Sequence, residues 1–231
     1  MNFFLIFIAI CLFISLFVIY YLSRDDLIFL RKDLSTEKIF NIAFLAFFAG
    51  LFFSRLFYAA FYSLKMFTNP LVFFLFPYFP GLVFSGGIVG GSLFLVFYSR
   101  LKNLPLGRIF DYFSISTLCS LPIGYLGYFI LSGKTLMSFV PVFIVLSYVV
   151  LVYVFFKFLY RYIQKGVIKD GSAGLIFLVL FSSVSLIANI FLSFKNMIFL
   201  KDPNNFLLSL TLLVSLVLFI RQERIIRFAR R

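Results

Sequence analysis

The sequence predicts an all-α integral membrane protein with seven transmembrane helices. Of its 231 residues, 63% are hydrophobic and only 13% are charged, which is about half the charged share of a typical globular domain. In lipid, only helices and closed barrels satisfy every backbone polar group. The apolar runs are about 18 to 25 residues long and lack strict alternation, which favours helices over barrel strands.

Seven apolar segments follow one another along the chain, at residues 3–22, 39–62, 82–99, 109–131, 137–160, 171–194 and 206–220. The last is short for a span. Residues 71–79 are also apolar but too short to cross, and Pro70 and Pro80 bracket them, which predicts an interfacial segment. No basic residues precede the first run and no small-residue cleavage site follows it, so it is interpreted as a retained span. Nothing resembles an interdomain linker, and residues 1–231 are expected to form a single polytopic membrane domain.

Basic residues are distributed asymmetrically between the predicted loops. One side carries sixteen of the 21 Lys and Arg residues and the other carries four, while Arg55 lies inside a span. Because cytoplasmic loops are enriched in Lys and Arg, this predicts the N-terminus outside and the C-terminus in the cytoplasm. The same asymmetry accounts for the net charge of +13 without nucleic acid as a partner. The basic C-terminal tail suits anionic lipid headgroups.

This orientation places several polar features at one depth. Arg55 lies about eight residues from the outer end of its span, or ~12 Å below the surface at ~1.5 Å per residue. Three other segments contribute to the outer half of the membrane at the same level. The residues expected there, with Tyr58 beside Arg55, are Ser85, Gly86, Gly87, Tyr125, Tyr128 and Asn189.

Arg55 is the most informative of these residues, because an arginine inside a span costs at least ~2.5 kcal/mol. No Asp or Glu lies in the outer half of any span. Arg55 can therefore snorkel outward to backbone carbonyls, or it can bind an anionic ligand such as a lipid phosphate through its bidentate guanidinium. Asp111 lies at the inner end of the fourth segment and is expected to form an ion pair there with Arg108 or Arg100.

The stretch Gly81-Leu82-Val83-Phe84-Ser85-Gly86-Gly87-Ile88-Val89-Gly90-Gly91 holds five glycines in eleven residues. Gly86 and Gly90, like Gly87 and Gly91, are four residues apart, which lets two membrane helices approach closely. Alternatively, the bare backbone at Gly86 and Gly87 lets a headgroup reach amide groups at a helix start. Both interpretations stay open for Gly86 and Gly87.

Composition excludes several kinds of site. The sequence contains no His, which removes the commonest general base and metal ligand. Cys11 and Cys119 each lie inside an apolar run and are interpreted as buried small hydrophobes rather than a disulfide or metal site. No metal and no cofactor are expected. No acidic residue lies mid-span, which disfavours an ion-coupled transporter.

Ordered motifs between residues 34 and 133 resemble one known family. They are Leu34-Ser35-Thr36-Glu37, Ser54-Arg55-Leu56-Phe57-Tyr58, Phe61-Tyr62, Asn69-Pro70-Leu71, the glycine stretch, Asp111, Pro122 and Gly124-x-x-Gly127-x-Phe129. The chain resembles prolipoprotein diacylglyceryl transferase, while residues 137–231 match in layout alone. The resemblance implies transfer of a diacylglyceryl group from phosphatidylglycerol to a cysteine thiol in a prolipoprotein signal peptide, in the bacterial plasma membrane. It also implies a lipid cavity, arginines that neutralise the phosphate, and a histidine before the Gly-Gly pair.

The chain departs from the family pattern at polar positions. Ser85 stands where the family has that histidine, and Tyr125 and Tyr128 stand where it has an arginine and an asparagine. The arginine- and glutamate-bearing motif of the sixth segment is replaced by residues 182–189. A positioned base typically contributes ~10²–10⁴-fold and a charge-stabilising donor ~3–4 kcal/mol. These losses predict reduced or absent activity.

Two hypotheses follow for function. The first is the family's transferase reaction, with the phosphate of phosphatidylglycerol or another anionic phospholipid on Arg55. The second is a non-catalytic relative that binds phospholipid or lipopeptide in the same outer-leaflet cavity. In both, the lipid-binding residues are expected to be Arg55, Tyr58, Ser85, Gly86, Gly87, Tyr125, Tyr128 and Asn189. No residue is assigned a catalytic role, since Ser85 occupies the histidine position.

Overall fold

The computed structural model describes residues 3–24, 26–32, 34–64, 81–131, 139–164, 166–193 and 202–229. Seven helices in this part of the chain are long and apolar enough to cross a membrane. They begin with α1 (Phe3–Ser23), α3 (Thr36–Tyr62), α5 (Phe84–Leu101) and α6 (Leu106–Leu131), and continue with α7 (Phe139–Val154), α9 (Ser172–Ser193) and α10 (Pro203–Ala229). A π-helical turn (Phe155–Leu159) and α8 (Tyr160–Gln164) extend α7, and the short α2 (Leu27–Arg31) follows α1.

The helices confirm the seven predicted segments, with one correction. The seventh is 27 residues long and begins at Pro203, so the expected short span at 206–220 was wrong. The reason is local. Pro203 occupies the first helical position, where its missing N–H is not needed, and the Asp202 carboxylate accepts the Asn204 amide at 3.0 Å. The interfacial segment expected at 71–79 lies outside the described residues.

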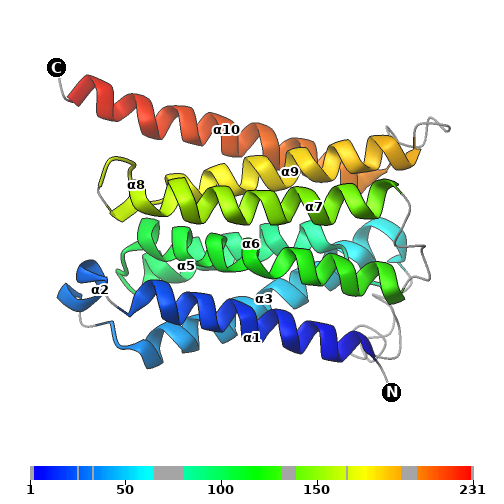
Figure 1. Ribbon diagram of the computed structural model, residues 1–231, viewed down its shortest axis with the longest axis horizontal. Coiled ribbons are helices and arrows are strands. Elements are labelled where there is room, and N and C mark those ends of the chain that lie inside the picture. Colours follow the sequence, from blue (N-terminus) through cyan, green and yellow to red (C-terminus); the bar gives the residue numbers. More distant parts are fainter. Residues whose placement is uncertain are drawn as a thin grey trace.

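Helix α6 lies at the centre of the bundle. It contacts α1, α5, α7 and α9, and half of its apolar window is buried, which is the largest share among the seven spans. Figure 1 shows the long helices lying alongside one another, with the two chain termini at opposite ends. The end at which α3 finishes and α5 and α10 begin is called here the Tyr62 end, and the opposite end is called the Arg108 end.

Glycines set the close packing of α3 against α5. A Cβ on Gly90 would lie 2.1 Å from Phe53 Cβ, and one on Gly86 would lie 2.8 Å from Phe57 Cβ. A Cβ on Gly87 would lie 3.1 Å from the Gly50 carbonyl oxygen. The packing interpretation of the small-residue spacing is therefore confirmed for these glycines.

Two further glycines bring α6 against α1. A Cβ on Gly127 would meet the Phe7 ring at 2.5 Å, and one on Gly124 would lie 3.5 Å from Cys11 Sγ. The Cys11 thiol donates to the Ser120 carbonyl at 3.6 Å. Gly124 and Gly127 are part of the Gly124-x-x-Gly127-x-Phe129 motif noted in the sequence, and in this structure they lie at the contact between α6 and α1.

The Arg108 end is held by a charged network that joins α2, α6 and the turn before α9. The Arg108 guanidinium pairs with Asp26 at 2.9 Å and with Asp170 at 3.0 Å, and the Tyr112 hydroxyl also donates to Asp26. Asp111 does not form the expected ion pair. Its two carboxylate oxygens accept the amides of Gly171 and Gly174 at 2.7 and 2.8 Å. Asp111 instead caps α9, because those amides have no partner within the helix.

Candidate functional site

Arg55 lies near the end of α3 and is only 2% exposed. Its guanidinium Nη1 donates to the Gly81 carbonyl at 2.7 Å, and its Cζ lies 5.8 Å from the centre of the Tyr58 ring. The aromatic face attracts the cation. The side chain is thus held inside the bundle, against the segment that leads into α5.

The segment 81–83 is fixed onto α3 by a reciprocal pair of hydrogen bonds. The Ser54 hydroxyl donates to the Val83 carbonyl at 2.9 Å, and the Val83 amide donates to the Ser54 carbonyl at 3.1 Å. Gly81 has φ of +148° and lies directly over the Tyr58 ring, where a Cβ would be 2.3 Å from a ring carbon. Both the backbone angle and the close approach require glycine here.

Helix α5 begins without a side-chain cap. Its N-cap residue is Val83, which supplies no side-chain hydrogen bond, and the first amide bonded within the helix is that of Gly87, which donates to the Val83 carbonyl at 3.1 Å. The amides of Phe84, Ser85 and Gly86 therefore have no partner inside the helix. Such helix starts favour anions.

Ser85 is 5% exposed and points toward α10. Its hydroxyl donates to Asn204 Oδ1 at 2.5 Å. An amide oxygen cannot take up a proton at neutral pH, so this contact fixes Ser85 without activating it. Gly86 and Gly87 face α3, as described above, and a ligand role for them stays a prediction.

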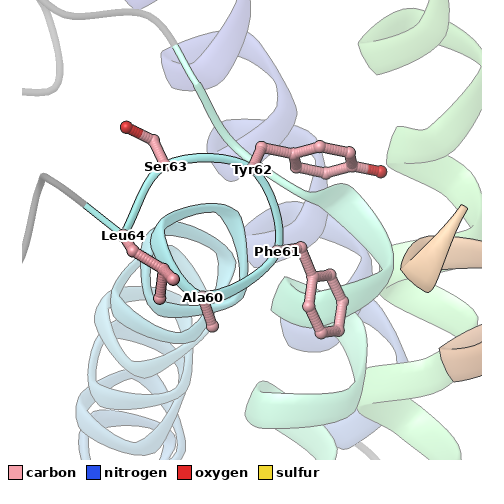
Figure 2. A pocket seen from close by; sticks show the side chains of 5 residues that line it. All are labelled: Ala60, Phe61, Tyr62, Ser63 and Leu64. Carbon is pink, nitrogen blue, oxygen red and sulfur yellow. The ribbon is translucent and has the colours of Figure 1, made fainter.

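Asp202 connects the start of α10 to the end of α3. The Tyr62 hydroxyl donates to Asp202 Oδ1 at 2.6 Å, and the Asn204 amide donates to the same oxygen at 3.0 Å. The Tyr62 ring also lies 5.6 Å from the Tyr58 ring. Figure 2 shows the Tyr62 side chain projecting from α3 at a pocket of about 330 Å³, which is lined by Ala60, Phe61, Tyr62, Ser63 and Leu64.

Tyr125 and Tyr128, the two predicted site residues of α6, have different surroundings. Tyr125 stacks on Tyr148 of α7 with ring centres 5.3 Å apart and meets the ring of Phe84, the first residue of α5, edge-on at 5.7 Å. Tyr128 is 55% exposed and meets Phe129 edge-on. The structure thus brings Tyr125 to the start of α5, whereas Tyr128 is the most exposed of the predicted site residues.

Polar residues of α9 bond across to neighbouring helices. Asn189 donates to Asn205 of α10 at 2.7 Å, and the Ser182 hydroxyl lies 2.8 Å from that of Thr211 on α10. Ser185 lies 3.4 Å from the Tyr148 hydroxyl on α7. These side chains hold α7, α9 and α10 together, as polar groups do between membrane helices.

A family model for prolipoprotein diacylglyceryl transferase matches residues 1–222. The chain belongs to the prolipoprotein diacylglyceryl transferase family. A search of curated proteins found no match. The family match extends past residue 133 into α10 and ends at residue 222, so the second half of the chain shares more than its layout with the family. Seven helices long and apolar enough to span, together with this family, indicate a multi-pass membrane protein.

The candidate site contains three polar residues that were not among the predicted site residues, namely Tyr62, Asp202 and Asn204. With Arg55, Tyr58 and Ser85 they form a continuous set of contacts at the Tyr62 end. A signal was present in the sequence, since Asp-Pro-Asn-Asn before an apolar run is typical of a helix start. Within the described residues, no group of His, Cys, Asp and Glu side chains suits a metal ion.

Proposed function

We propose that this protein binds an anionic phospholipid of the phosphatidylglycerol type at the Tyr62 end and transfers its diacylglyceryl group to the cysteine thiol of a prolipoprotein. The sulfur forms a bond to the glycerol carbon that carries the phosphate ester. The carbon–oxygen bond to phosphate breaks, glycerol phosphate leaves with the electron pair, and the thiol proton is lost.

The burial of Arg55 is the observation that carries this proposal. A cation with 2% exposure inside an apolar helix is costly to bury, and such residues commonly mark functional sites in membrane proteins. The Gly81 carbonyl supplies one acceptor, at 2.7 Å. A phosphate group can bind the planar Arg55 guanidinium through two oxygens and can also approach the uncapped start of α5. Membership of the family, whose substrates are a phospholipid and a prolipoprotein, supports the same assignment.

We expect the transfer to be slow. Ser85 stands at the histidine position and is held by Asn204 at 2.5 Å, so it does not replace a base worth ~10²–10⁴-fold in rate. Tyr125, at the position of the family arginine, brings no positive charge. A phosphate at this site is therefore neutralised by Arg55 with less help than in relatives that keep both residues.

A second candidate function is phospholipid or lipopeptide binding without transfer. The contact between Ser85 and Asn204 favours it, because the residue at the position of the family base is paired with a group that takes no proton. In both candidates the lipid site lies in the outer leaflet of a bacterial-type plasma membrane, with the N-terminus outside, as the distribution of basic residues indicates.

One assay separates the two candidates. The purified protein in lipid nanodiscs is incubated with phosphatidylglycerol and a lipobox peptide, beside an active family enzyme, and the thioether product is measured by mass spectrometry. Product above the level without protein supports transfer. Phosphatidylglycerol that remains bound without product supports the second candidate, and a protein with neither product nor bound phospholipid contradicts both.

A further inference from the structure

We infer that Asp202 is the catalytic base of this chain, and that its carboxylate accepts the thiol proton of the prolipoprotein cysteine. This inference rests on the proposed transfer function. The family's histidine is absent, yet the step still requires a group that removes the thiol proton, because the thiolate is the reactive form of cysteine.

The distribution of acidic side chains leaves Asp202 as the described carboxylate at the Tyr62 end. The other described acidic residues belong to the Arg108 end, either in its hydrogen-bond network or in the first turn of α3. These are Asp26, Glu37, Asp111, Asp170 and Glu223. The sequence has no histidine at all.

The hydrogen bonds of Asp202 leave one oxygen available. Oδ1 accepts both the Tyr62 hydroxyl at 2.6 Å and the Asn204 amide at 3.0 Å. Among the described residues, none donates to Oδ2. The two bonds to Oδ1 fix the plane of the carboxylate. Tyr62, which makes one of them, also lines the pocket of about 330 Å³ at the end of α3 (Figure 2).

Asp202 lies where it can remove the thiol proton while Arg55 binds the phosphate. The Arg55 guanidinium lies against the Tyr58 ring. The Tyr58 ring is 5.6 Å from the Tyr62 ring, and the Tyr62 hydroxyl donates to the Asp202 carboxylate. The cation and the carboxylate are thus connected through two aromatic rings. On the other side, Asn204 joins Asp202 to Ser85 through the 2.5 Å contact, which places the carboxylate beside the start of α5.

The step balances in atoms and charge. The thiol proton moves to Asp202 Oδ2, and the sulfur pair attacks the glycerol carbon. The bond between that carbon and the phosphate oxygen breaks, and Arg55 stabilises the charge of the departing glycerol phosphate. Asp202 then returns its proton to water, which restores the carboxylate for the next cycle.

Asp202 also has a structural role, and the test separates it from the catalytic one. Its Oδ1 caps α10 by accepting the Asn204 amide. Asparagine caps helix starts as well as aspartate does, and its amide oxygen can accept both bonds that Oδ1 accepts now. Asp202→Asn therefore retains the fold and the lipid site and removes proton uptake alone.

The experiment measures transfer to a lipobox peptide by wild type, Asp202→Asn and Asp202→Ala in nanodiscs containing phosphatidylglycerol. We expect Asp202→Asn to bind phosphatidylglycerol like wild type and to transfer ~10²–10⁴-fold more slowly. Added formate should partly restore the rate of Asp202→Ala, because a small carboxylate can take the vacated place. Glu37→Gln, an exposed change in α3 at the Arg108 end, should behave like wild type.

The outcomes are distinct. Transfer by Asp202→Asn at the wild-type rate overturns this inference and leaves the proposed function standing. A slow Asp202→Ala variant that formate does not accelerate indicates a positioning role alone and also overturns it. Absence of transfer by wild type, beside an active family enzyme, overturns the proposed function and this inference with it.

Discussion

Arg55 and Gly81 are separated by 26 residues in sequence and are joined by a 2.7 Å hydrogen bond from the guanidinium to the carbonyl. This contact ties the end of α3 to the segment that starts α5, and it holds the Arg55 guanidinium inside the bundle. The lipid-binding role of Arg55 can be tested directly.

Arg55→Ala should weaken phosphatidylglycerol binding ~10–100-fold, because a hydrogen bond to a charged group is worth ~1.5–3 kcal/mol. Native mass spectrometry of the purified protein measures the bound lipid, and titration with labelled phosphatidylglycerol measures the affinity. Arg100→Ala, an exposed arginine of α5 at the Arg108 end, serves as the control. Equal lipid content in wild type and Arg55→Ala would count against a phosphate at Arg55.

Ser85→His should raise the transfer rate, by up to ~10²-fold or more. The change restores a group that can take a proton at the position where the family has one. Ser85→Ala removes the hydroxyl without adding a base and should not accelerate the reaction. Peptide modification followed by mass spectrometry measures both variants, and equal rates for the two would show that position 85 lies outside the reacting centre.

Gly90→Ala should destabilise the protein by about 1–3 kcal/mol through overpacking. The added Cβ would lie 2.1 Å from Phe53 Cβ, which forces α3 and α5 apart. Gly91→Ala is a matched control, since its Cβ would lie 3.7 Å from the Ala46 carbonyl oxygen of α3, an ordinary van der Waals distance. Thermal unfolding in detergent compares the two, and the packing account fails if Gly91→Ala is the less stable.

Asp111→Ala should destabilise the protein by about 1–3 kcal/mol, because it leaves the buried amides of Gly171 and Gly174 without an acceptor. Hydrogen exchange of the first turn of α9 should rise together with the loss of thermal stability. Glu37→Ala, at an exposed position of α3, should change neither measurement. Unchanged exchange at α9 would contradict the capping role of Asp111.

The predicted orientation has its own test. A fluorescent protein fused to the C-terminus should fluoresce in bacterial cells, and alkaline phosphatase fused at the same place should be inactive, because the excess of Lys and Arg assigns that side to the cytoplasm. The reverse pattern would move the site around Arg55 to the inner leaflet.

Much of the fold could be read from apolar runs, because helices that face lipid have long uninterrupted hydrophobic segments. The start of α10 was missed because the sequence Asp202-Pro203-Asn204-Asn205 is polar, so the apolar run begins only at Phe206. The same omission removed Asp202 and Asn204 from the expected site. Tyr62 was part of a recognised motif, but its hydroxyl partner is 140 residues away and local patterns carry no information about such pairs.

The sequence by itself determined that this chain has seven apolar helices, that Arg55 lies inside one of them, and that no histidine is present. These properties follow from composition and from the cost of polar groups in lipid. The tertiary structure decided which partners the polar groups have. It directed Gly86 and Gly87 to α3, Ser85 to Asn204, and Asp202 to Tyr62, because hydrogen bonds between helices depend on how the helices pack and not on their distance along the chain.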